Sequence, residues 1–171
     1  KFRPLGNRLA IITNGGGPGA MAADRAGDMG IPLAELSNET MAVLNKALPT
    51  NWSHANPIDI GGDATPERYR EAIMAVTHDP NVDSTLVMLS PQAMTDPLAV
   101  AQAIIEVADK LNRSLICCWM GEEQVREARK LLEDAGIPAF RMPETAIELF
   151  HHISKYYRNQ KLLLQTPEPT R

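Results

Sequence analysis

The sequence predicts an α/β fold, in which one mostly parallel five-stranded sheet forms the middle of three layers and helices cover both faces. Short apolar runs alternate with longer segments whose apolar residues recur every three or four positions, a pattern typical of strands separated by helices. The first apolar run, 9–12, leads into three glycines and then Pro18, the usual composition of a turn from a buried strand into a helix. Together these features indicate parallel strands joined by helical crossovers.

Five segments are expected to be strands and six to be helices. The expected strands are 9–12, 31–34, 85–89, 115–119 and 139–140, and the expected helices are 18–29, 40–48, 67–78, 96–111, 122–135 and 143–157. Thr65 before Pro66 predicts the start of the third helix, and Gly136 followed by Pro138 predicts the end of the fifth. Five strands favour the flavodoxin-like strand order over the six-stranded dinucleotide-binding order.

Length and composition indicate a single domain in a longer protein. The chain has 171 residues, of which 44% are hydrophobic and 22% charged, and its formal net charge of -4 argues against a nucleic-acid or anionic-membrane partner. The adjacent Cys117 and Cys118 would point to opposite faces of a strand, so we expect no disulfide and favour a cytoplasmic setting. We expect residues 1–7 to be a linker, 8–157 the domain, and 158–171 an interdomain linker.

The glycine-rich turn after the first strand is the first candidate site. Asn14, Gly15, Gly16 and Gly17 come just before Pro18, where backbone N–H groups at a helix start favour an anion such as phosphate. A tight turn without a ligand is the structural alternative. Residues 15–20 also satisfy the dinucleotide pattern G-x-G-x-x-A, with Glu35 near the expected ribose-binding position, and a flavin mononucleotide site is a further alternative on topology.

Two more loops are expected at the same edge of the sheet, because ligands of such folds bind outside the carboxyl ends of the strands. The loop after strand 85–89 leads into a helix. Either Thr95 or Asp96 caps the start of this helix, or its backbone N–H groups stay open and offer a second anion site. The segment 56–67 places Asp59 between two isoleucines, where it either stabilises a turn or serves the site. The candidate residues in these two loops are Asn56, Asp59, Ser90, Gln92, Ala93, Met94 and Thr95.

No catalytic or metal-binding set is visible in the sequence. His151 and His152 are neighbours on a helix and face different directions, while His78 is expected at a helix end and His54 in a loop without a base or nucleophile near it. No Ser/His/Asp or Cys/His arrangement is present, and no histidine lies at ligand spacing from the cysteines. We therefore assign no catalytic residue and no metal ligand.

Several motifs in collinear order resemble one family. The runs 6–19, 56–59, 67–69, 79–83 and 157–160 are similar to those of the flavodoxin-like, succinyl-CoA synthetase-like domain of NDP-forming acyl-CoA synthetases. The resemblance implies that the parent protein interconverts acyl-CoA, phosphate and NDP through an acyl phosphate and a phosphohistidine. The phosphorylated histidine lies in a Ser-His-Thr-Gly context, which this sequence lacks, so none of its four histidines takes that role.

For this domain the resemblance implies a supporting part in phosphoryl transfer. A helix N-terminus matching Ser90–Thr95 would help to hold the phosphoryl group, although this sequence has Ser90-Pro91-Gln92 where the succinyl enzyme has glycines. CoA, ATP or ADP and Mg are implied for the parent, with no cofactor held tightly here and no synthetase activity in the isolated domain. The implied partners are neighbouring CoA-binding and ATP-grasp domains, with a homo-oligomer as a further option.

The same domain arrangement is found in bacterial protein lysine acetyltransferases of the Pat type, which the sequence also resembles, including at Arg158-Asn159-Gln160. Their parent would be an acetyltransferase in which this module is not catalytic. The residues that separate the two parents lie outside these 171 residues.

Overall fold

A computed structural model describes residues 2–111 and 113–165 and contains one five-stranded sheet. The strands are β1 (Leu9–Thr13), β2 (Ile58–Asp59), β3 (Ser84–Leu89), β4 (Ser114–Trp119) and β5 (Ala139–Phe140). They are parallel throughout and lie in the order β2-β1-β3-β4-β5, which confirms the predicted flavodoxin-like topology.

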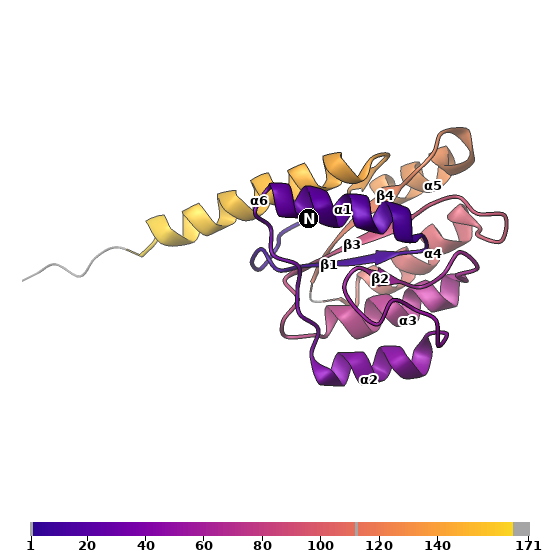
Figure 1. Ribbon diagram of the computed structural model, residues 1–171. Helices are drawn as coiled ribbons and strands as arrows, with labels where there is room; N and C mark the ends of the chain where they lie inside the picture. The colour runs from indigo at the N-terminus through magenta and orange to yellow at the C-terminus, as the bar shows by residue number, and fades with distance from the viewer. Residues whose placement is uncertain (1, 112, 166–171) are drawn as a thin grey trace, which may run out of the picture.

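Six helices cover the sheet: α1 (Gly16–Asp28), α2 (Asn38–Ala47), α3 (Pro66–Thr77), α4 (Pro97–Ala108), α5 (Glu123–Asp134) and α6 (Pro143–Leu163). Helices α1 and α6 lie together on one face, while α3 and α4 lie on the other, with α2 outside α3 (Figure 1). Because α6 is long, its second half projects beyond the sheet on the side opposite to the tip of the β1 arrow (Figure 1).

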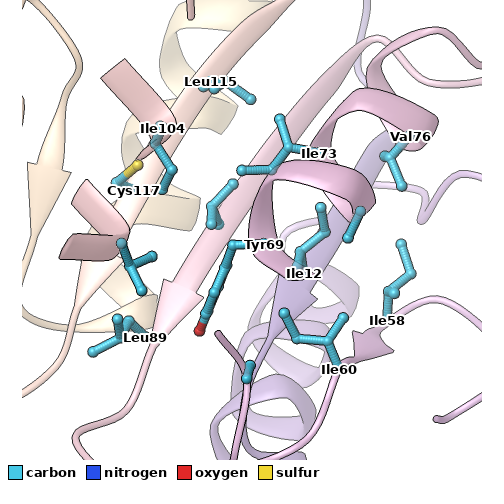
Figure 2. Packing of buried hydrophobic residues seen from close by; sticks show 14 of the residues in the cluster. Ile12, Ile58, Ile60, Tyr69, Ile73, Val76, Leu89, Ile104, Leu115 and Cys117 are labelled. Carbon is cyan, nitrogen blue, oxygen red and sulfur yellow. The ribbon is translucent and has the colours of Figure 1, made fainter. Parts of the chain in front are cut away.

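The sheet separates two apolar clusters, as its alternating side chains require. Ile12, Val87 and Cys117 face α3, α4 and α5, whereas Leu9, Ile11 and Met88 are in the cluster with α1 and α6. In the larger cluster the ring of Tyr69 lies among Ile12, Ile60 and Leu89 (Figure 2). Its hydroxyl donates to the Met88 carbonyl at 2.9 Å, so the one polar atom of this buried ring is satisfied.

The edge strand beside β1 differs from the prediction. We expected 31–34 to be a full strand, but this segment makes only one bridge, between Leu9 and Leu33, and the paired strand β2 is Ile58–Asp59. The Asn56 side chain lies between them: its Oδ1 accepts from Ile11 N at 3.0 Å and its Nδ2 donates to the carbonyls of Leu9 and Ala34. An amide side chain thus takes the place of ladder hydrogen bonds that a continuous strand would make.

Most helix boundaries agree with the predicted ones to within one residue, and four do not: α2 begins two residues before residue 40, α4 ends three residues before residue 111, and the start of α1 and the end of α6 also differ. Thr65 caps α3 by accepting from Arg68 N, as predicted, and Gly136 follows α5 with φ of +80°. Helix α1 begins at Gly16, two residues before Pro18, so the glycines form its first turn. Helix α6 continues six residues past Tyr157 and so includes 158–163, which we expected to be linker. Their role between domains stays a prediction, and residues 166–171 of the same expected linker lie outside the described part.

Candidate functional site

Parts of the three candidate loops lie together at the carboxyl edge of the sheet, where Asn14, Ser90, Thr95 and Gly62 are linked by hydrogen bonds. Asn14 directly follows β1, Ser90 directly follows β3, and the two residues are joined by two hydrogen bonds. Asn14 Nδ2 donates to the Ser90 carbonyl at 2.8 Å, and Ser90 N donates to Asn14 Oδ1 at 2.7 Å. Thr95 is also within 3.4 Å of Asn14 Nδ2, and its hydroxyl donates to the Gly62 carbonyl at 3.1 Å. The network is neutral and buried, so these polar groups hold the loops together rather than face a ligand.

The N-terminus of α1 is open to solvent at this edge. Gly15 is its N-cap and offers no side chain, and the first turn contains no acidic residue. Thr13 fixes the turn, because its hydroxyl donates to the Gly15 carbonyl at 2.8 Å and accepts from Gly15 N at 3.1 Å. Gly16 and Gly17 are exposed, and a Cβ added at Gly17 would meet nothing within 4 Å. The backbone N–H groups and the helix dipole therefore present partial positive charge to an incoming anion.

A carboxylate stands beside this open helix end. Asp59 Oδ1 accepts from Gly61 N at 3.0 Å, the turn-stabilising role weighed from the sequence. Its Oδ2 lies 3.4 Å from where a Cβ of Gly16 would be. The negative charge suits the helix dipole but repels phosphate, so an anion bound here needs a cationic partner from outside this loop.

The N-terminus of α4 is closed, unlike that of α1. Asp96 Oδ1 accepts from the backbone N of Leu98 and of Ala99, both at 3.1 Å, and Pro97 has no N–H to offer. Of the two predicted caps, Asp96 takes this role. The preceding Gln92, Ala93 and Met94 are exposed, and Met94 retains 77% of its accessible surface. This loop therefore offers an exposed contact surface, while its helix start is already neutralised by a carboxylate.

Asn56 lies away from the other candidates, because its amide is committed to the backbone of β1 and residue 34. The sequence analysis missed Thr13 as the side chain that fixes the glycine turn, and Gly62 as the acceptor that joins the second loop to the third. A hydroxyl directly before a glycine triplet was the available signal for Thr13. No sequence signal pointed to Gly62, since its part depends on where Thr95 lies in space.

Other chemistries find little support at this edge. Burial raises the pKa of both cysteine thiols, that of Cys118 to about 12, so neither is a ready nucleophile. Within residues 2–111 and 113–165, no group of three or more His, Cys, Asp or Glu side chains is arranged to hold a metal ion. No helix in that same part of the chain is long and apolar enough to span a bilayer.

The comparison with protein families decides the assignment. The Ligase-CoA domain model matches residues 9–163, which is nearly the whole described domain. The chain belongs to this family. The match agrees with the resemblance inferred from the motifs.

Individual relatives agree with this assignment. The chain is 39% identical over 156 residues to acetate–CoA ligase [ADP-forming] I of Archaeoglobus fulgidus, covering 91% of this chain and 22% of the relative. It is 42% identical over 154 residues to acetate–CoA ligase [ADP-forming] of Methanocaldococcus jannaschii, covering 88% and 22%. A solved dinucleotide-forming acetyl-coenzyme A synthetase 1 of Ca. Korarchaeum cryptofilum, in complex with phosphate and ADP, superposes with a TM-score of 0.88 at 30% identity, covering 99% of this chain and 37% of that one.

The chain thus spans about a fifth of the length of these two relatives.

Proposed function

We propose that this Ligase-CoA domain is one part of an ADP-forming or other NDP-forming acetyl-CoA synthetase, in which its carboxyl edge supports phosphoryl transfer. The open N-terminus of α1 carries the proposal: it is a helix start with exposed Gly16 and Gly17, without a side-chain cap and without an acidic residue in its first turn. Such a helix start stabilises a nearby phosphoryl group by about 0.3–1 kcal/mol at an exposed site. In this proposal the phosphoryl contact is at Gly15–Gly17 rather than at Ser90–Thr95, because the Asp96 carboxylate already accepts from backbone N–H groups at the start of α4.

The reaction of the parent protein divides between domains. Phosphate displaces CoA from an acyl-CoA to give an acyl phosphate. The acyl phosphate passes its phosphoryl group to a histidine and leaves as the carboxylate, and NDP then takes the phosphoryl group to form NTP and free the histidine. In our proposal this domain supplies neither the histidine nor the site of the reacting nucleotide. It supplies partial positive charge from α1 and an exposed contact surface from Gln92, Ala93 and Met94.

The residues described here do not fit a magnesium site, because they contain no cluster of three ligating side chains. We propose that Mg, CoA and the reacting ATP or ADP are bound by the rest of the parent. The Asp59 carboxylate lies beside Gly16 and repels phosphate. A phosphate at the start of α1 therefore requires cations or a histidine from a neighbouring domain. The proposed partners are the CoA-binding and ATP-grasp domains of the same protein. We propose that this protein is cytoplasmic, with assembly into a homo-oligomer as a further option.

Two measurements test this function. The purified domain, incubated with acetyl-CoA, ADP, phosphate and magnesium, is expected to form no ATP. In the full-length parent, Gly17→Asp places a negative charge against the incoming phosphoryl group and is expected to slow phosphoryl transfer about tenfold, corresponding to about 1.4 kcal/mol. Ala93→Asp, at the loop next to the closed helix, is expected to have a smaller effect.

Ala42→Asp is the matched control, because Ala42 is exposed on α2, which lies outside α3. All three variants should remain folded, and Gly17→Asp should be no less stable than the unmodified protein in denaturant unfolding. Equal phosphoryl-transfer rates for folded Gly17→Asp and Ala42→Asp would show that α1 does not contact the phosphoryl group, and ATP formation by the domain alone would contradict the proposed division of labour.

A further inference from the structure

A second concave surface lies at the opposite edge of the sheet, where α6 projects. A groove of about 650 Å³ lies between residues 3–7, the loop 29–31 and the second half of α6. We call it the amino-edge groove, because residues 3–7 lead into the start of β1 and the loop 29–31 follows the end of α1. Its volume is in the range of sites that hold nucleotide-sized molecules.

The charged side chains lining the groove are all basic. Arg3, Lys155, Arg158 and Lys161 line it together with His151, and no aspartate or glutamate of the described residues does. None of the four Lys and Arg side chains takes part in an ion pair within that part of the chain. Asp28, which ends α1 just before the loop 29–31, does not line the groove. In a chain of net charge -4, such a concentration of uncompensated cations produces a local positive field.

The cations come from two distant parts of the chain. His151, Lys155, Arg158 and Lys161 are separated by three or four residues and so share one side of α6. Arg3 reaches the same groove from the N-terminal segment, which is held by a 2.9 Å hydrogen bond from its backbone N to Ser114 Oγ. Its guanidinium carbon lies 5.2 Å from the centre of the Tyr157 ring, a cation–π contact that fixes the side chain beside α6.

The groove also has an apolar component. Pro4, Leu5, Met29, Ile31 and Leu164 line it alongside the cations. Leu5 retains 62% of its accessible surface and Leu164 83%, so both are available to a ligand. Burial, together with the neighbouring His152, Lys155 and Arg158, lowers the pKa of His151. A ligand that suits both components carries several negative charges and a less polar body.

We propose that the amino-edge groove binds a soluble polyphosphate, with a nucleoside di- or triphosphate as the ligand that uses both components. Its phosphates lie against Lys155, Arg158, Lys161 and Arg3, because arginine and lysine pair with phosphate oxygens through charge-assisted hydrogen bonds. Its base and ribose lie against the aliphatic residues. An inorganic polyphosphate has the same charged chemistry without the second contact. This site is distinct from the α1 helix end.

Calorimetric titration of the purified 171-residue chain with ATP, ADP and inorganic triphosphate, without magnesium, tests the groove. At low salt we expect ATP to bind with a Kd below about 1 mM. The double variant Arg158→Ala/Lys161→Ala should weaken binding about tenfold, corresponding to about 1.4 kcal/mol, since both side chains are exposed and their loss leaves the core intact. Lys46→Ala/Lys110→Ala removes two exposed positive charges elsewhere and should leave the Kd unchanged.

Backbone amide NMR shifts locate the bound molecule. Shifts confined to residues 3–7, 29–31 and 151–161 support the groove. ATP binding more tightly than triphosphate supports a nucleotide, whereas equal affinities support an inorganic polyphosphate held by the cations alone. A Kd weaker than about 1 mM for all three probes, equal losses in the two double variants, or shifts at Gly16 and Gly17 instead would overturn the proposal. Shifts at Gly16 and Gly17 would instead agree with the α1 contact of the proposed function, whereas the other outcomes leave the Gly17→Asp test of phosphoryl transfer unaffected.

Discussion

The two edges of the sheet are held together by different physical interactions. At the carboxyl edge, Asn14, Ser90 and Thr95 join the loops through neutral, buried hydrogen bonds. At the amino edge, Asp83 and Arg8 join the starts of β1 and β3 through charges: Asp83 Oδ2 accepts from both the backbone N and the Nε of Arg8 at 2.9 Å. The packing there is tight as well, since a Cβ on Gly6 would come within 2.6 Å of Asp83 Oδ2.

This difference indicates which edge can respond to ions. Neutral buried hydrogen bonds depend little on salt or pH, so the carboxyl edge provides a fixed frame around the open end of α1. Charge pairs and unpaired cations at the amino edge are sensitive to both. We therefore expect variants at the first edge to change stability uniformly across conditions, and variants at the second to change it most at low salt.

The largest effect is expected for Asn14→Ala. Asn14 is 1% exposed, and its loss leaves the N–H and the carbonyl of Ser90 without their side-chain partner. Each buried group left unpaired costs about 1–3 kcal/mol. Denaturant unfolding should show this loss equally at low and high salt. Asn51→Ala, at an exposed turn, is the control and should change the free energy of unfolding by less than about 0.5 kcal/mol. A strongly salt-dependent cost for Asn14→Ala would contradict the neutral network.

The next largest effect is expected for Asp83→Asn at the amino edge. Burial alone would raise the pKa of Asp83, but the hydrogen bonds from Arg8 outweigh it and hold that pKa below its ordinary value. A carboxyl whose pKa is lower in the folded state stabilises the fold above its unfolded pKa of about 3.9, and this contribution disappears as the pH falls through the folded value. Charge-assisted hydrogen bonds contribute about 1.5–3 kcal/mol, and we expect the lower end because the Arg8 side chain is 45% exposed.

Unfolding measured between pH 5 and pH 2, at about 10 mM and about 1 M salt, checks this expectation. Asp83→Asn should lower stability at pH 5 and flatten the acid slope. Asp79 adds to the same slope: burial would raise its pKa, but the backbone N–H groups of Asn81 and Ser37 keep it lowered. Asp24→Asn, on the exposed side of α1, should leave the stability at pH 5 within about 0.5 kcal/mol. If Asp83→Asn costs the same at both salt concentrations, the amino edge is not held by charge.

The contrast between the edges also explains what the sequence could and could not predict. Parallel strands place their carboxyl ends at one edge, so the strand pattern alone was enough to predict that the loops at 14–17 and 90–95 lie together. The edge strand could not be placed, because the choice between 31–34 and Ile58–Asp59 depends on an Asn56 side chain that bonds the backbone of β1. A two-residue strand also carries almost no periodic signal.

The amino-edge groove could not be predicted either, because it also depends on tertiary contacts. The spacing of Lys155, Arg158 and Lys161 on one helix side was visible in the sequence, but their relation to Arg3 depends on the long α6 returning to the N-terminal segment. The predicted helix also ended at residue 157, so Arg158 and Lys161 were assigned to a linker rather than to α6. Local patterns predict helices and strands, whereas sites built across the sheet depend on tertiary contacts.

The smallest effect, and the most specific one, is expected at Gly17 in the isolated domain. Gly17→Asp adds a carboxylate to the open first turn of α1, where a Cβ meets nothing within 4 Å and the helix dipole favours negative charge. Gly17→Ala lowers the conformational entropy of the unfolded chain in the same way but adds no charge. We therefore expect the aspartate variant to exceed the alanine variant in free energy of unfolding by about 0.3–1 kcal/mol at low salt, and to lose that margin at about 1 M salt. An aspartate variant no more stable than the alanine variant at low salt would mean that Asp59 already saturates this helix end. The same substitution that stabilises the domain is the one expected to slow phosphoryl transfer in the parent, because both effects depend on one set of N–H groups.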